Sequence, residues 1–238
     1  MKKIIIGHLY PKQMNVYGDM GNVITLRYRL EKRGFTVDYI PIDSLKQLKD
    51  TNPDFILGGG GQDSNQGVVQ SDLLKYAAEL RSRCEDGLVG LLICGMYQMF
   101  GHRFTLPDGS QINGAAILDL ETTAGEDRLI GNIVVDSPFG KLVGFENHSG
   151  RTYLGAQLRA LGKVTKGAGN NGEDGKEGTV YKNVFGTYLH GPALAKNPRL
   201  ADELIRRALE QRGVSTDLEP LDDFIEYQAA AVATKRPR

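Results

Sequence analysis

The stretch LLICGMYQMFG, Leu91 to Gly101, ends an apolar run at a cysteine that is followed by glycine. The apolar run is typical of a short strand buried on both faces, and the Gln, Met and Phe after it indicate the first turns of a helix. Cys94 therefore falls on the turn between them. α/β enzymes expose a nucleophile at such a turn, because the strand end holds it and the helix N-terminus favours its anion. The alternative is a core cysteine, since free Cys is often buried.

Strand and helix patterns alternate through the N-terminal half. Residues 4–9, 36–42, 55–57 and 88–93 read as strands, and 22–33 and 70–83 have helical periodicity. This order predicts an α/β fold with a central, mostly parallel sheet and helices on both faces. Beyond residue 100, strands are expected at 115–120, 130–135, 141–146 and 180–188, where they extend the sheet and form an added antiparallel β layer. With no repeat or domain boundary, residues 1–238 are expected to form a single domain.

Composition excludes several classes of function. Of the 238 residues, 40% are hydrophobic, and Lys+Arg and Asp+Glu balance at 29 each, so no broad basic field attracts nucleic acid or an anionic membrane. Two cysteines are too few for a disulfide framework, and the N-terminus lacks a secretory pattern. No apolar run reaches the roughly 20 residues that span a bilayer. These features predict a cytoplasmic protein that binds no nucleic acid and is not an integral membrane protein.

A thiol nucleophile needs a base within hydrogen-bond reach, and the chain has four histidines. His190 is the best placed, because VFGTYLHGP predicts a strand that ends at this histidine, on the rim where doubly wound folds gather functional groups. On its own, a histidine at a strand end is more often structural. His148 is a rival candidate, whereas His8 and His102 are less suited by position.

Acyl transfer also needs donors for a developing oxyanion. Glycines 58–61 can turn backbone N–H groups toward an anion, and the N–H of Gly95 follows the thiol directly. A plain tight turn and a phosphate cradle are the alternatives for the glycine run, and without the cysteine both would rank ahead of an oxyanion hole.

Three further segments lead to simpler expectations. Residues 166–178 are polar and rich in glycine, so an exposed loop or wide hairpin turn is expected there. Asn197 is expected to cap a helix with Pro198 at its first position, and the basic tail 234–238 to be frayed. Cys84 lies in the polar last turn of a predicted helix, so its replacement by Ser is expected to be nearly silent.

Several segments together indicate a family. GGGGQD, ICGMYQMFG and TYLHGP, in this order and spacing, resemble the class I glutamine amidotransferase domains of the cobyric acid synthase type. Within that family, MNVYGDMGN, AILDLETTAGEDRLIGN, GFENHSGRTYL and NPRLAD are similar to the glutaminase subunits of lipid II isoglutaminyl synthases. The resemblance spans nearly the whole chain and implies a flavodoxin-like fold.

The resemblance also implies roles for individual residues. Cys94 would be the nucleophile and His190 the general base, Gly60 and Gly95 would donate to the oxyanion, and Arg128 would bind L-glutamine. Taken alone, Arg128 would be interpreted as an ordinary surface arginine.

A partner follows from the same resemblance. This chain would form a heterodimer with a MurT-like subunit related to Mur ligases, to which it supplies ammonia for the amidation of the D-glutamate α-carboxyl of lipid II. ATP and Mg²⁺ are expected on that partner, and no cofactor or metal in this chain. The alternatives are a glutaminase that feeds another synthetase, such as one of the cobyric acid type, and a non-catalytic binding module of the same fold.

Two positions depart from the family pattern. Met96 stands where a second glycine is usual after the cysteine, so a side chain could narrow the pocket or shift the Gly95 N–H. Many class I amidotransferases also place a Glu two residues after the catalytic His, where this chain has Pro192. The orienting acid is therefore expected from the partner subunit, with Glu146 as a weaker internal candidate.

Overall fold

The computed structural model describes residues 3–44, 46–61 and 63–236, and its first sheet has the order β11-β12-β4-β3-β1-β2. Its strands are parallel except for β11, which is antiparallel to β12. The predicted parallel sheet is thereby confirmed. The strands of this sheet are β1 (Lys3–Leu9), β2 (Thr36–Ile42), β3 (Phe55–Gly58), β4 (Val89–Ile93), β11 (Thr179–Tyr181) and β12 (Val184–Thr187).

The β11–β12 hairpin replaces the single strand that was expected over residues 180–188. Lys182, between the two strands, has φ of 51°. A side chain in this left-handed region marks a tight turn, so the chain reverses where the sequence pattern appeared continuous.

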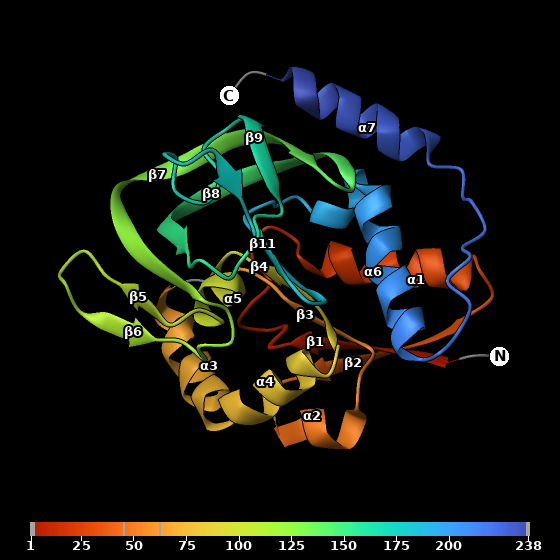
Figure 1. The fold of residues 1–238 in the computed structure, drawn as a ribbon, viewed down its shortest axis with the longest axis horizontal. Helices are drawn as coiled ribbons and strands as arrows, with labels where there is room; N and C mark the ends of the chain where they lie inside the picture. Colours follow the sequence, from red (N-terminus) through yellow and green to blue (C-terminus); the bar gives the residue numbers. More distant parts are fainter. Residues whose placement is uncertain (1–2, 45, 62, 237–238) are drawn as a thin grey trace.

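Helices cover both faces of the first sheet, as expected (Figure 1). Along β4, Val89, Leu91 and Ile93 belong to one core cluster, whereas Leu92 belongs to the other. This alternation follows from the two-residue repeat of a strand. The first cluster includes residues of α1 (Met20–Glu31) and α6 (Pro198–Gln211). The second includes residues of α2 (Lys46–Thr51), α3 (Asp63–Lys75), α4 (Ala77–Glu85) and α5 (Gly95–Met99).

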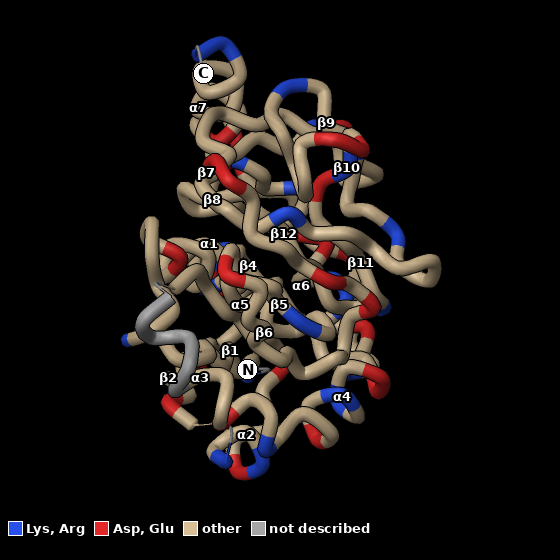
Figure 2. Tube along the Cα trace, turned by 90° about the vertical axis from the view of Figure 1, so that its left-hand side faces the viewer, with Lys and Arg blue, Asp and Glu red and all other residues tan. Residues whose placement is uncertain are grey.

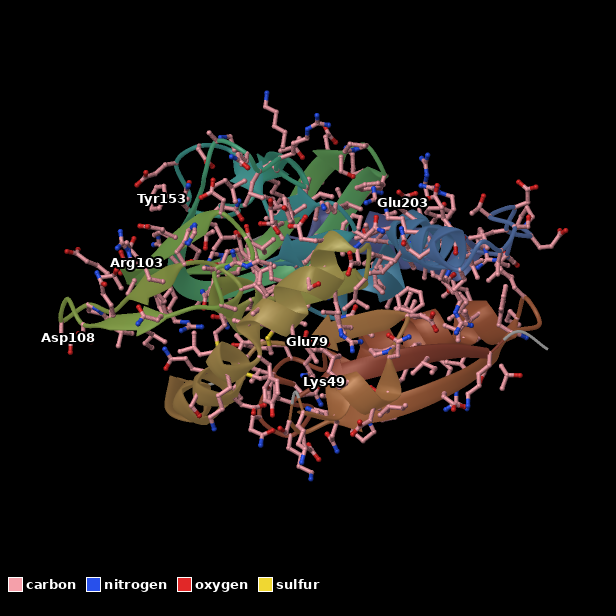
Figure 3. The ribbon with its side chains drawn as sticks, turned by 60° about the horizontal axis from the view of Figure 1, so that its bottom comes forward. Lys49, Glu79, Arg103, Asp108, Tyr153 and Glu203 are labelled. Carbon is pink, nitrogen blue, oxygen red and sulfur yellow. The ribbon has the colours of Figure 1, made fainter. Side chains whose placement is uncertain are left out.

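A second, mostly antiparallel sheet lies beside the first, and its centre is a long hairpin of β7 and β8. Figure 3 shows Arg103 and Asp108, from the β5–β6 hairpin, on the same side of the molecule as Tyr153 of β8 and away from Glu203 of α6. The bounds are β5 (Arg103–Thr105), β6 (Gln111–Asn113), β7 (Leu120–Ser137), β8 (Gly140–Leu154), β9 (Gly162–Lys166) and β10 (Lys176–Glu177).

The prediction of a strand at residues 115–120 is wrong, because β7 begins only at Leu120. The N–H groups of Ala115 and Ile117 donate instead to the carbonyls of Met99 and Phe100. The segment therefore folds back on the end of α5, and its apolar side chains complete the core without forming a ladder.

Residues 166–178 form the wide hairpin turn that was one of the two expectations, because they connect the antiparallel strands β9 and β10, but part of this turn is buried. Asn170, Asn171 and Glu177 are buried. Asn170 donates to the carbonyl of Gly178 at 3.0 Å and accepts from its N–H at 2.8 Å. Polar side chains thus satisfy buried backbone groups in place of apolar packing, which hydropathy does not register.

The C-terminal helices pack against both sheets. A 3₁₀-helix, η1 (Ala193–Lys196), precedes α6, which begins at Pro198 as predicted. The side chain of Asn197 does not cap α6, however, but bonds to both the N–H and the carbonyl of Val143. A further helix that was not expected, α7 (Phe224–Lys235), lies over β7 and β8 and takes in the start of the tail (Figure 1).

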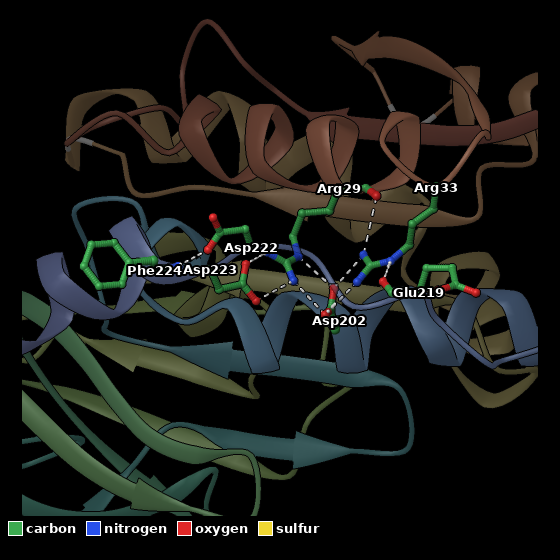
Figure 4. Close-up of polar contacts among 7 residues, drawn as sticks. All are labelled: Arg29, Arg33, Asp202, Glu219, Asp222, Asp223 and Phe224. Atoms are coloured by element: carbon green, nitrogen blue, oxygen red, sulfur yellow. Dashed lines mark hydrogen bonds and ion pairs between the residues drawn. The ribbon is translucent and has the colours of Figure 1, made fainter.

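A largely buried ion-pair cluster connects the segment before α7 to helices α1 and α6. Arg29 of α1 contacts Asp202 of α6 at 2.6 Å and Asp223 at 2.5 Å, and Arg33 joins Asp202 at 2.9 Å (Figure 4). The side chain of Arg29 is only 2% exposed. Elsewhere, positive and negative residues are interspersed along the chain (Figure 2). No helix in the described residues is long and apolar enough to cross a membrane.

Candidate active site

Cys94 occupies the predicted turn between β4 and α5. Its φ of 51° and ψ of −107° are unusual for a residue with a side chain. The Cys94 N–H donates to the carbonyl of Thr187 at 2.9 Å, and its own carbonyl accepts from Gln98 at 3.0 Å. Strain of this kind persists only where the surroundings hold it, and here it presents a partly buried thiol at the sheet rim.

A cavity of about 240 Å³ opens at this turn. The five residues that the family resemblance singled out all line it, and so does the rival His148. They come from β3–α3, β4–α5, the β7–β8 hairpin and the segment after β12, so tertiary structure gathers positions that are far apart in the sequence. The five are Gly60, Cys94, Gly95, Arg128 and His190.

His190 lies next to Cys94, and two backbone hydrogen bonds to Phe145 fix its place. Its N–H donates to the carbonyl of Phe145 at 2.8 Å, and its carbonyl accepts from Phe145 at 3.1 Å. A Cβ added to Gly60 would lie 3.3 Å from Cε1 of His190 and 3.6 Å from Cβ of Cys94. Cys94 and His190 therefore both pack close to the Cα of Gly60, where a side chain would crowd them.

Asp19, just before α1, supplies an acid that the sequence analysis missed. Its Oδ1 lies 3.7 Å from Nδ1 of His190, and both side chains are buried. Burial by itself lowers the pKa of His190, but the neighbouring Asp19 and Cys94 outweigh it and raise the pKa to about 9. The imidazole is thus able to keep a proton beside the sulfur. The only sequence signal for Asp19 is its place in MNVYGDMGN, a segment of the family resemblance.

Glu146, the internal acid considered from sequence, has a different place. Its carboxylate accepts from the N–H groups of Ala168 and Gly169 at 2.8 to 3.1 Å. It therefore fixes the turn after β9, whereas Asp19 is the carboxylate placed against His190.

The two expected oxyanion donors differ in availability. The N–H of Gly60 donates to Oδ2 of Asp19 at 2.7 Å, so in this conformation it already has an acceptor. Gly95 is the first residue of α5, where an N–H has no acceptor within the helix. Gly95 is thus the donor that the geometry favours.

Met96 does not narrow the cavity. Its side chain is fully buried in the core beneath the elbow, where a Cβ on Gly58 would come within 2.4 Å of its Cγ. The departure from the family pattern is therefore accommodated by a glycine on β3.

Arg128 reaches the mouth of the cavity from β7. Its Nε donates to Oδ1 of Asn147 at 2.9 Å, and its Nη2 to the Asn147 carbonyl at 3.1 Å. Asn147 in turn donates to the hydroxyl of Tyr17 at 2.6 Å. Because this chain of contacts holds an exposed guanidinium at the cavity, Arg128 is placed to meet a carboxylate.

The surroundings of the other two histidines, His8 and His102, place both outside the cavity. His8 is buried in β1 next to Tyr39, and burial lowers its pKa to about 4. His102 is exposed and contacts Asp119 at 3.1 Å. Neither lines the cavity, as their positions suggested.

A thiol on a strand-to-helix elbow of a parallel sheet, with a buried histidine beside it, is the arrangement that α/β enzymes with a cysteine nucleophile use. The chain belongs to the CobB/CobQ-like glutamine amidotransferase domain family, which matches residues 5–198.

Similar proteins extend this result. The chain is 42% identical to the lipid II isoglutaminyl synthase (glutamine-hydrolyzing) subunit GatD of Staphylococcus aureus, over 99% of this chain and 97% of that protein. The subunit of the same name from Streptococcus pneumoniae is 36% identical, over 94% of this chain and 88% of its own length. A solved structure titled as a glutamine amidotransferase superposes with a TM-score of 0.60 at 17% identity, covering 88% of this chain and 99% of that one, which supports the fold.

Proposed function

We propose that this protein is the glutaminase subunit of a lipid II isoglutaminyl synthase. It hydrolyses L-glutamine and passes ammonia to an ATP-dependent, MurT-like ligase subunit, which amidates the D-glutamate α-carboxyl of lipid II in the cytoplasm. The observation that carries the proposal is the cavity in which Cys94 and His190 meet, in a chain that matches the named subunits over nearly its whole length.

The chemistry follows from the positions of the two groups. The Cys94 thiolate attacks the carboxamide carbon, a C–S bond forms, and the carbonyl electrons move to an oxyanion that the Gly95 N–H stabilises. Protonated His190 gives its proton to the nitrogen as the C–N bond breaks, which releases ammonia and leaves a glutamyl thioester.

Hydrolysis then restores the enzyme. His190 takes a proton from water, the resulting hydroxide attacks the thioester carbon, and the C–S bond breaks to give glutamate and the thiolate. Arg128 holds the substrate by its α-carboxylate through a charge-assisted hydrogen bond.

The test is to purify the chain with the Mur-ligase-like subunit of its own organism and to supply lipid II, ATP and glutamine labelled in the amide nitrogen. Label transferred to lipid II by the wild type, but not by a complex with Cys94→Ser, supports the proposal. If the Cys94→Ser complex amidates lipid II from free ammonia, the ligase partner is shown to be intact. Absence of glutamine-dependent amidation in an intact complex would refute the assignment.

A further inference from the structure

His148 lies in the same cavity as the catalytic pair, with a ring orientation fixed by two contacts. The imidazole stacks on Tyr188 at 3.6 Å between ring centroids and 9° between planes. Its Nδ1 lies 2.8 Å from the carbonyl of Gly150. Because a carbonyl can only accept a hydrogen bond, Nδ1 must carry the proton of the neutral ring, and Nε2 is left as an acceptor.

That acceptor has no partner in the described part of the chain. Nε2 of His148 is buried and makes no hydrogen bond there, although the residue lines the cavity. Burial lowers the pKa of His148 to about 3, and nearby His190 and Arg128 act in the same direction. The ring therefore stays neutral at physiological pH and offers a lone pair, not a charge. A buried acceptor without a donor is costly unless a ligand supplies one.

We propose that Nε2 of His148 accepts a hydrogen bond from the α-ammonium group of the substrate L-glutamine. The inference rests on the proposed function, since it names a subsite of the same cavity. His148 directly follows Asn147, which holds Arg128, and its Cα is paired with that of Leu129, the neighbour of Arg128.

The geometry of glutamine favours the ammonium over the carboxamide. Its α-ammonium and α-carboxylate share one carbon, so both must be bound at the end of the cavity where Arg128 lies. The carboxamide must lie at the other end, against Cys94. Arg128 and His148 would then recognise the two groups that distinguish an amino acid from a simple amide.

A comparison of two substrates on two enzymes isolates this contact. Glutaric acid monoamide is glutamine without its α-amino group. We expect the wild type to prefer glutamine in kcat/KM, and His148→Phe, which keeps a ring on Tyr188 but removes the acceptor, to lose about tenfold or more of that preference, mainly through KM. His102→Phe, at an exposed histidine outside the cavity, serves as the matched control and should keep the wild-type preference.

Several outcomes overturn the inference. If His148→Phe loses the same factor on both substrates, the residue acts on the carboxamide or on structure, and the α-ammonium subsite is refuted. Should the Phe variant fail to fold, His148→Leu, which also lacks the acceptor, decides the same comparison. A wild-type complex that hydrolyses neither substrate refutes the proposed function itself, whereas glutamine turnover with an unchanged preference in the variant refutes only the subsite.

Discussion

At the scale of single residues, backbone hydrogen bonds to Thr187 and Gln98 hold Cys94 in a conformation with positive φ. These bonds do not involve the Cys94 side chain. We therefore expect Cys94→Ser to fold normally but to lose glutamine hydrolysis, because the swap keeps the size and removes the thiolate. Glutamate release, measured beside circular dichroism, checks both. Substantial turnover by a folded Cys94→Ser enzyme would exclude Cys94 as the nucleophile.

Cys84, the other thiol, lies in the polar last turn of its helix, as predicted, but its side chain faces the core. It is fully buried on α4, and burial raises the pKa of its thiol to about 12. We now expect Cys84→Ser to lower the free energy of unfolding by roughly 1–3 kcal/mol, because a hydroxyl enters an apolar site, while the folded protein keeps its turnover. Urea denaturation with activity assays measures both, and unchanged stability would contradict the burial argument.

Asp19 is expected to matter for turnover through His190. Asp19→Asn removes the charge beside the imidazole, so we expect kcat for glutamine to fall by roughly a hundredfold with little change in KM.

The same pairing predicts a pH dependence of stability. Since the pKa of His190 is raised from 6.5 to about 9, its contribution to stability is full below pH 6.5 and is lost as the pH rises through about 9. The variant should therefore show a smaller decline of Tm over this range. Identical pH profiles in the two proteins would argue against the pairing.

Arg128 is exposed, so its loss should affect binding more than stability. We expect Arg128→Ala to raise KM for glutamine by about tenfold or more, and Arg128→Lys to recover only part of this, because a point charge lacks the guanidinium fork. Steady-state kinetics with a melting curve tests this. Parental KM in the Ala variant would show that glutamine is held elsewhere.

At the scale of elements, Arg29 joins α1, α6 and the segment before α7 (Figure 4). Arg29→Ala removes the cation that Asp202 and Asp223 share and leaves Asp202 with Arg33 alone, so we expect it to lower the free energy of unfolding by about 3 kcal/mol. Chemical denaturation measures the loss. Arg27→Ala is the matched control on the same helix, because the Arg27–Glu31 pair is exposed and worth well under about 1 kcal/mol. Equal effects of the two substitutions would contradict this view of the cluster.

At the scale of the whole molecule, the chain is expected to act slowly alone. The distance of 3.7 Å between Asp19 and His190 is longer than a hydrogen bond, so the imidazole is paired in charge but not tightly oriented. We expect the proposed synthetase subunit to complete this orientation when it docks, by shortening the contact or by adding a carboxylate of its own, because an orienting acid is worth several powers of ten in rate.

The comparison of glutamine hydrolysis by the free chain and by the complex tests this expectation. We expect the complex to be faster by about tenfold or more. Two sets of variants then show whether the orienting acid is Asp19 or a carboxylate of the partner. Asp19→Asn should abolish the stimulation if the acid is Asp19, and one of the partner's interface Asp or Glu residues, changed one at a time, should abolish it if the acid is the partner's. Equal rates for the free chain and the complex would show that the site is already complete.

The sequence by itself determined the elements with strong local signals. The parallel strands and the Cys94 elbow were predicted because an apolar run that ends in Cys-Gly needs no distant partner to be recognised. His190 was selected by the strand pattern that ends at it, whereas Arg128 came only from the family resemblance, and the structure brings both to the cavity. Local pattern failed at residues 115–120, where backbone N–H groups bond to carbonyls at the end of α5. At residues 166–178 it predicted the hairpin turn but not the burial of its amide side chains, which bond to backbone groups.

Only the tertiary structure decided which groups meet. Asp19 reaches His190 because parallel strands bring their carboxyl ends to one edge, so residues far apart in the chain become neighbours there. The same packing turned the Gly60 N–H toward Asp19 and buried Cys84. Strand and helix patterns depend on side chains a few residues apart, whereas hydrogen-bond partners and burial depend on contacts across the fold, which the order of residues alone does not specify.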